Sequence, residues 1–215
     1  MHTPKKFPNT DFHREEKIMT RYTSAGIVML ITTLFLSPAS FGADNLIART
    51  ATTEYTILSG YGITHRGFGA TRTQVQTFDT IGRFGYFLSD NIGNGWYKGR
   101  HELLLELPLH LVVDPKISPM TGGYILGCWK FTSLKEFVPY VFAGGGVLYV
   151  DLGLPTMGSR LDFSYQGGTG LQYFIGKDTA ISLEYRYHHI SNAGTATPNE
   201  PLNSSKALLG ISFFR

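Results

Sequence analysis

The chain has 215 residues, of which 42% are hydrophobic and only 16% are charged, and its formal net charge is +3. Residues 1–42 hold five of the basic and three of the acidic residues, so the remainder carries 14 basic against 13 acidic groups. A nearly neutral chain gives no electrostatic basis for binding nucleic acid. The single cysteine, Cys128, excludes an internal disulfide.

The N-terminus is predicted to be an extension followed by a secretory signal peptide, together covering residues 1–42. Ala25–Leu36 is an uncharged, mostly apolar run that follows Lys17 and Arg21 and precedes a segment of small residues. This order is typical of an export signal, and we place the cleavage after Gly42. The run is shorter than the ~20 residues that a membrane-spanning helix needs. A retained N-terminal anchor is the alternative.

From residue 43 onwards the composition favours short strands over helices. Glycine and aromatic residues are frequent, charges are few, and no segment has the length and apolarity of a membrane-spanning helix. Two architectures remain: a soluble periplasmic β domain, such as a sandwich, and a transmembrane β-barrel.

Turn signals divide this part of the chain into eight predicted strands. Their approximate bounds are 50–63, 70–88, 99–113, 121–133, 137–150, 161–175, 179–191 and 204–214. The second is the least regular, because Phe68–Asp79 is polar and alternates poorly, and Thr80–Leu88 is either a bend or a separate piece. Long connections after the fifth and seventh strands and short turns after the fourth and sixth are typical of outer-membrane barrels. An even number of strands places both termini in the periplasm.

Alternation of apolar and polar side chains is clearest in Leu103–Val113. Its odd positions are aliphatic, whereas Glu102, Glu106 and His110 share the opposite face. The segments 161–175, 179–191 and 206–214 repeat this period of two, which indicates strands with two different faces. The charged residues of the polar face are Glu102, Glu106, Lys130, Asp162, Glu184 and Arg186.

A polar interior with an apolar, tyrosine-rich exterior is inverted relative to a soluble barrel. Eight strands enclose just enough space for side chains to fill. We therefore predict an all-β fold, an eight-stranded antiparallel transmembrane β-barrel of the outer membrane formed by residues 43–215.

A potential catalytic pair lies near the end of the seventh predicted strand. His189 and Ser191 are two residues apart, so in a strand they point to the same face, here the apolar one. Serine needs an adjacent base to act as a nucleophile, and that base needs a third group to orient it. Polar side chains in a lipid-facing stripe cost free energy, which favours a functional role for this pair.

Several residues after the pair are candidates for the remaining roles. Asn203 can return to the level of His189 if the last strand pairs with the seventh, while Glu200 is the only carboxylate of the connecting loop, and Asn199 is a further polar neighbour. Asn192 and the Gly194 amide are candidates to bind a developing oxyanion. His188 and His189 point to opposite faces, so they do not form a metal pair.

The run from His189 to Gly194, followed by Pro198 and Asn199 and a short last strand, resembles the outer-membrane lipid A 3-O-deacylase family (PagL-type). That resemblance implies an eight-stranded barrel with a serine-hydrolase site on its outer wall near the extracellular rim of a Gram-negative outer membrane. It implies His189 as general base, Ser191 as nucleophile, and Asn192 with Gly194 as the oxyanion site. The implied substrate is lipid A or lipopolysaccharide in the surrounding lipid, no metal or organic cofactor is implied, and a homodimer is left open.

The chain departs from the family pattern at one site residue. The pattern has a glutamate twelve residues after the serine, where this chain has Asn203. Asparagine can orient a histidine but cannot stabilise an imidazolium by charge. Either Asn203 completes the triad, which we favour, or Glu200 substitutes, or activity is low. The alternative function is a non-enzymatic structural or adhesive barrel with a degraded site.

Overall fold

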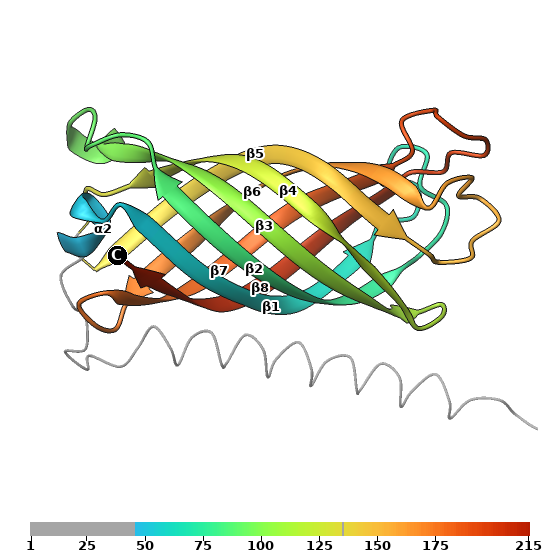
Figure 1. Cartoon of the computed structure of the whole chain (residues 1–215), viewed down its shortest axis with the longest axis horizontal. Helices are drawn as coiled ribbons and strands as arrows, with labels where there is room; N and C mark the ends of the chain where they lie inside the picture. The colour runs from blue at the N-terminus through green and yellow to red at the C-terminus, as the bar shows by residue number, and fades with distance from the viewer. Residues whose placement is uncertain (1–45, 135) are drawn as a thin grey trace, which may run out of the picture. The chain divides into compact units, whose positions relative to one another are not determined.

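The computed structural model describes residues 46–134 and 136–215, which form a short helix and a closed β-barrel (Figure 1). The helix α2 covers Leu46–Thr50 and a single 3-10 turn, η1, covers Gly95–Tyr97. The strands are β1 Thr53–Thr64, β2 Gln76–Phe87, β3 Gly99–Asp114, β4 Ser118–Phe131, β5 Phe137–Val150, β6 Leu161–Phe174, β7 Thr179–Ser191 and β8 Leu202–Phe214. The predicted signal peptide lies outside the described residues.

Each strand pairs antiparallel with its neighbours along the chain, and β8 pairs with β1 to close the sheet. This closure confirms the predicted eight-stranded barrel and excludes the sandwich, because a sandwich leaves edge strands that a closed sheet does not have. None of the helices among the described residues is long and apolar enough to cross a bilayer.

The predicted strand bounds lie within three residues of the observed ones, except at the start of the second strand. The first strand begins at Thr53 instead of residue 50, because α2 continues to Thr50. The second begins at Gln76 instead of residue 70, and residues 70–75 belong to the loop between β1 and β2. This loop, residues 65–75, binds side chains near the start of β8, as described below, which explains why its polar sequence does not alternate.

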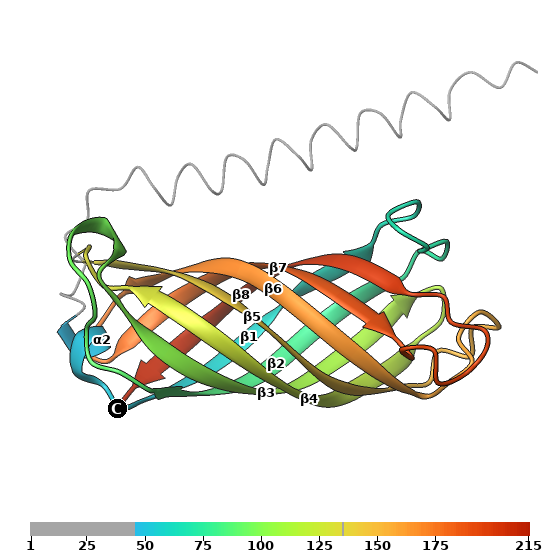
Figure 2. The ribbon, with the colours of Figure 1, turned by 90° about the horizontal axis from the view of Figure 1, so that it is seen from above.

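The connections lie at two ends of the barrel (Figure 2). The β1–β2, β5–β6 and β7–β8 loops share one end with the short turn 115–117, whereas α2 and the C-terminus lie at the other. Connection length does not distinguish the two ends, since the β2–β3 connection, residues 88–98, is long and the β3–β4 turn is short. The long connection contains η1, which gives it local structure of its own.

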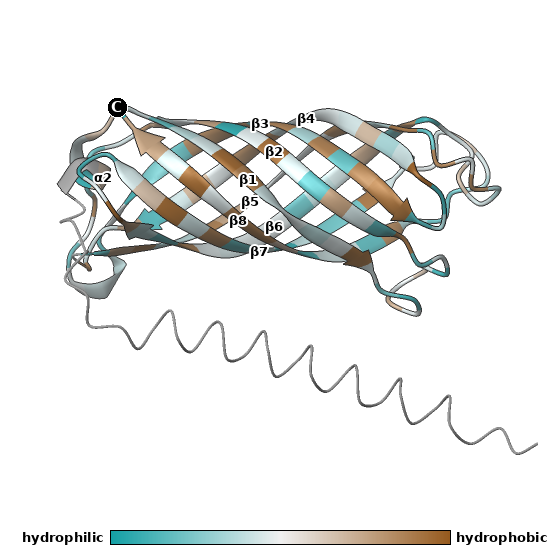
Figure 3. Cartoon of the chain, turned by 90° about the horizontal axis from the view of Figure 1, so that it is seen from below, coloured by the Kyte–Doolittle hydropathy of each residue, from teal (hydrophilic) through white to brown (hydrophobic). Residues whose placement is uncertain are grey.

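The outer wall of the barrel is apolar. Along β3, buried and exposed residues alternate, with Leu105, Leu107 and Leu109 exposed and Glu102, Glu106 and His110 buried. Figure 3 shows hydrophobic residues recurring along the strands of the wall. The inverted arrangement expected for a barrel in lipid is therefore present.

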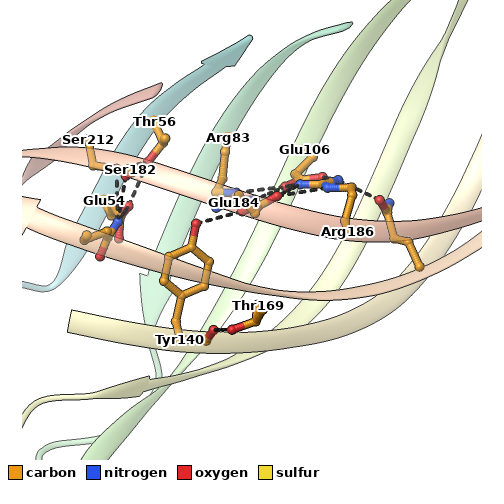
Figure 4. A network of polar contacts seen from close by, with 12 residues as sticks. Glu54, Thr56, Arg83, Glu106, Tyr140, Thr169, Ser182, Glu184, Arg186 and Ser212 are labelled. Atoms are coloured by element: carbon orange, nitrogen blue, oxygen red, sulfur yellow. Dashed lines mark hydrogen bonds and ion pairs between the residues drawn. The ribbon is translucent and has the colours of Figure 1, made fainter. Parts of the chain in front are cut away.

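The interior contains a network of paired charges (Figure 4). The Arg83 guanidinium lies 2.6 Å from a carboxylate oxygen of both Glu106 and Glu184. Arg186 lies 2.9 Å from Glu106 and also pairs with Glu184. Because all four side chains are buried, each charge depends on its partners for compensation.

Candidate active site

The candidate catalytic pair lies on the outward face of β7. His189 and Ser191 are partly exposed and follow the exposed residues Leu183 and Tyr185 on the same face. The His189 Nε2 atom lies 3.0 Å from Ser191 Oγ. A single strand therefore provides a base and a hydroxyl in hydrogen-bond contact, as the sequence predicted from their spacing.

Asn203 occupies the position of a third group. It lies directly opposite His189 in the β7–β8 pairing, and its Oδ1 is 2.7 Å from His189 Nδ1. The predicted return of the last strand to the level of His189 is confirmed. The imidazole thus bridges the serine hydroxyl on one side and an amide oxygen on the other.

The Asn203 side chain is only 4% exposed even though it lies on the outward face, because the β1–β2 loop covers it. Its Nδ2 donates to the Phe68 carbonyl, at 3.1 Å, and to Thr71 Oγ1, at 2.9 Å. The Tyr187 hydroxyl donates to Asn203 Oδ1 over 2.6 Å. These hydrogen bonds hold the Asn203 side-chain amide in one orientation.

An aromatic ring supports the imidazole from the neighbouring strand. Tyr165 of β6 is paired with His189, and the two rings stack with centroids 4.2 Å apart and planes 18° apart. Stacking fixes the plane of the imidazole, while the hydrogen bonds fix its rotation within that plane. The ring is therefore held in one orientation toward Ser191.

Glu200, the alternative third member, has a different role in the structure. Its carboxylate is buried and accepts hydrogen bonds from the backbone N–H groups of Arg72, at 2.8 Å, and Thr73, at 2.6 Å. Burial acts to raise the pKa of Glu200, but these N–H groups outweigh it and the pKa is lowered. The carboxylate joins the β7–β8 loop to the β1–β2 loop, and its bonds are to that loop instead of to His189.

The predicted oxyanion residues form a compact turn after Ser191. The Gly194 N–H donates to Asn192 Oδ1 over 2.9 Å, and Asn192 Nδ2 donates to the carbonyls of Ala196 and Pro198. Asn199 Oδ1 accepts from the Asn192 N–H over 3.0 Å. The structure thus brings Asn192, Gly194 and Asn199 together beside Ser191. The two predicted oxyanion donors, the Gly194 N–H and Asn192 Nδ2, already donate hydrogen bonds within the loop.

A second histidine–serine pair lies on the outward face nearby. His65 Nε2 is 2.8 Å from Ser205 Oγ, which is also 2.7 Å from the Tyr185 hydroxyl. Among the described residues, His65 Nδ1 has no hydrogen-bond partner corresponding to Asn203. This pair lacks the orienting group that His189 has. Substitution of Ser205 therefore serves as a control for substitution of Ser191.

Sequence reasoning missed three contributors to the site. Tyr165 and Tyr187 were expected only as part of an aromatic exterior, and Thr71 was assigned to a strand. Tyr187 shares the face of His189, so its parity was a usable signal. The sequence gives no such signal for Thr71, because its contact with Asn203 depends on the path of the β1–β2 loop.

Comparison with known proteins identifies the family of the chain. The profile described as lipid A 3-O-deacylase (PagL) matches residues 62–212, which is more than half of the chain. The chain belongs to the lipid A 3-O-deacylase (PagL) family. No curated protein sequence matches the chain significantly.

Solved structures show that the chain shares its fold with other small barrels. The outer membrane enzyme PagL is 17% identical with a TM-score of 0.52, over 74% of this chain and 98% of that one. Neisserial surface protein A is 15% identical with a TM-score of 0.53, over 76% of this chain and 97% of that one. At these identities the likeness establishes the fold, whereas membership of the PagL family rests on the profile.

Proposed function

We propose that this PagL-family chain is a serine esterase of the outer membrane that hydrolyses the ester-linked acyl chain at the 3-O position of lipid A. The observation that carries the proposal is the position of the His189 ring, which lies 3.0 Å from Ser191 Oγ and 2.7 Å from Asn203 Oδ1. Such a constellation is recognised by geometry and roles, regardless of the fold that carries it.

The reaction follows from these contacts. Ser191 Oγ attacks the ester carbonyl while its proton passes to His189 Nε2. The resulting tetrahedral intermediate collapses, the bond to the sugar oxygen breaks, and His189 returns the proton to that oxygen. Water then attacks the acyl-serine with His189 again as the base, and the fatty acid is released with Ser191 restored.

The place of the pair suits a lipid substrate. His189 and Ser191 lie on the apolar outer face at the end of the barrel that carries the β1–β2, β5–β6 and β7–β8 loops, whereas the interior holds buried ion pairs. A lipid lying against the wall would reach Ser191 without entering the barrel. We propose that this end faces the outer leaflet, where lipid A is found.

The turn after Ser191 is proposed to bind the developing oxyanion. The Gly194 N–H would do so by exchanging its bond with Asn192 Oδ1 for one to the substrate, and Asn192 Nδ2 by releasing a loop carbonyl. A donor aimed at the oxyanion is worth about 10²–10³-fold in rate. Asn192 and Gly194 therefore have both a structural and a catalytic role in the proposal.

Mass spectrometry of lipid A tests the function directly. Cells expressing the wild type, Ser191→Ala or Ser205→Ala are compared, with folding of each barrel checked by its heat-modifiable gel migration. We expect loss of one acyl chain with the wild type and with Ser205→Ala, and intact lipid A with Ser191→Ala. Intact lipid A with all three folded proteins would overturn the proposal and favour the non-enzymatic barrel.

A further inference from the structure

The side-chain amide of Asn203 uses its whole hydrogen-bonding capacity. Oδ1 accepts from His189 Nδ1 and from the Tyr187 hydroxyl, and Nδ2 donates to the Phe68 carbonyl and to Thr71 Oγ1. A primary amide has two donor hydrogens and two acceptor lone pairs, so none is left over. The surroundings of residue 203 therefore match an amide group atom by atom.

The Phe68 carbonyl fixes which way the amide faces. A carbonyl oxygen only accepts, so the atom 3.1 Å from it must be the donor Nδ2. Oδ1 must then face His189, whose Nδ1 carries the proton that this bond requires. The Nε2 lone pair is left facing Ser191 Oγ, which is the tautomer a general base needs.

A carboxylate at position 203 would lose this match. One of its oxygens would face the Phe68 carbonyl with no hydrogen between them. Thr71 could not compensate, because its hydroxyl hydrogen is already donated to the Pro201 carbonyl over 2.9 Å. Since the position is almost fully buried, water would not screen the repulsion.

We propose that Thr71 and the Phe68 carbonyl form a cradle specific for an amide at position 203, through which the β1–β2 loop sets the tautomer of His189. This inference rests on the proposed esterase function. Thr71 is a positioning residue that acts through Asn203. The asparagine that departs from the family pattern is thus the residue that this loop is built to hold.

Two variants of Thr71 test the cradle. Thr71→Val keeps the shape but removes the hydroxyl, and Thr71→Ser keeps the hydroxyl. Thr71 Oγ1 bonds Asn203 Nδ2, the Asn203 backbone N–H and the Pro201 carbonyl, so Thr71→Val breaks three hydrogen bonds. We expect this variant to lower kcat at least about tenfold, with KM nearly unchanged. Thr71→Ser is expected to restore most of the wild-type rate. In the background of Asn203→Leu, Thr71→Val should lower kcat by a smaller factor, because the side-chain amide through which Thr71 acts is gone.

Asn203→Asp tests the specificity for an amide. We expect its kcat/KM at neutral pH to fall below that of the wild type. We also expect the acidic limb of the pH profile to move to higher pH, because a carboxylate favours the imidazolium. A general loss of structure would lower the rate without moving that limb.

The outcomes separate the two proposals. An Asn203→Asp enzyme as active as the wild type at neutral pH, or a Thr71→Val enzyme with the wild-type kcat, would overturn the cradle while leaving the esterase intact. A wild type that is inert on lipid A would overturn the esterase. Nitrogen NMR of His189 then still tests the cradle, which requires the Nδ1–H tautomer in the wild type and a mixture in Thr71→Val.

Discussion

Asn203 Oδ1 lies 2.7 Å from Nδ1 of His189, the residue directly opposite it in the β7–β8 pairing. Two adjacent strands thus provide the base and its orienting group at one level of the wall. The other nitrogen of the same ring, Nε2, contacts Ser191 Oγ. Because Ser191 is the proposed nucleophile, its loss is expected to lower the rate of deacylation most.

Replacement of Ser191 by alanine is expected to lower deacylation by at least about 10³-fold, because the nucleophile is removed. Purified wild type, Ser191→Ala and Ser205→Ala are compared for release of fatty acid from lipid A in detergent. Ser205→Ala should stay within about threefold of the wild type, since only the His189 pair has an orienting group. Equal losses in both variants would contradict the assignment of Ser191.

Replacement of Tyr165 by leucine removes the ring that stacks on His189. An aromatic pair contributes about 0.5–1.5 kcal/mol, so we expect kcat to fall by about two- to thirteenfold. Tyr165→Phe keeps the stacking and should retain the wild-type kcat. Similar losses in both variants would show that the Tyr165 hydroxyl, and not the stacked ring, is what matters.

The contact between Glu200 and the β1–β2 loop should depend on pH. The pKa of Glu200 is lowered in the folded protein, so its contribution is present above the ordinary glutamate value and is lost as pH falls through the lowered one. Hydrogen exchange at the Arg72 and Thr73 amides measures this. At neutral pH we expect faster exchange in Glu200→Gln than in the wild type, and at acidic pH a smaller difference. A constant difference would exclude titration of Glu200 as the cause.

Loss of Arg186 should destabilise the barrel. Arg186→Met leaves Glu106 and Glu184 with one buried cation instead of two, and breaking such a pairing costs about 3–5 kcal/mol. Urea unfolding in lipid vesicles measures the change. Arg160→Met, which removes an exposed ion pair with Asp151, should change the free energy of unfolding by less than about 1 kcal/mol.

A charge on the outer wall tests contact with lipid. Leu107 lies in the middle of β3 and is 75% exposed, so Leu107→Arg is expected to cost about 2–4 kcal/mol in a bilayer. Val113→Arg, on the same face near the end of β3, should cost about 0–1 kcal/mol. Equal costs for the two variants would contradict a depth-dependent lipid environment.

The fold was largely predictable because the alternation of side chains reports directly on the two faces of a strand. In β3 and β7 the buried glutamates and the exposed aliphatics fall where the pattern placed them. The register of His189 opposite Asn203 followed from the same parity. Residues 70–75 were wrongly assigned to the second strand, because loop residues that contact other loops show no regular alternation in the sequence. The role of Thr71 depends on a contact 132 positions along the chain, which no local pattern encodes.

The surroundings of Asn203 also connect the site to the closing of the barrel. Thr71 and Phe68 belong to the first hairpin and Asn203 to the last strand, so their contacts cross the seam at which β8 meets β1. A chain whose first and last strands have not yet paired carries the serine and the histidine without a fixed amide against the imidazole. The complete constellation therefore arises only when the barrel closes, which ties hydrolytic competence to the finished fold.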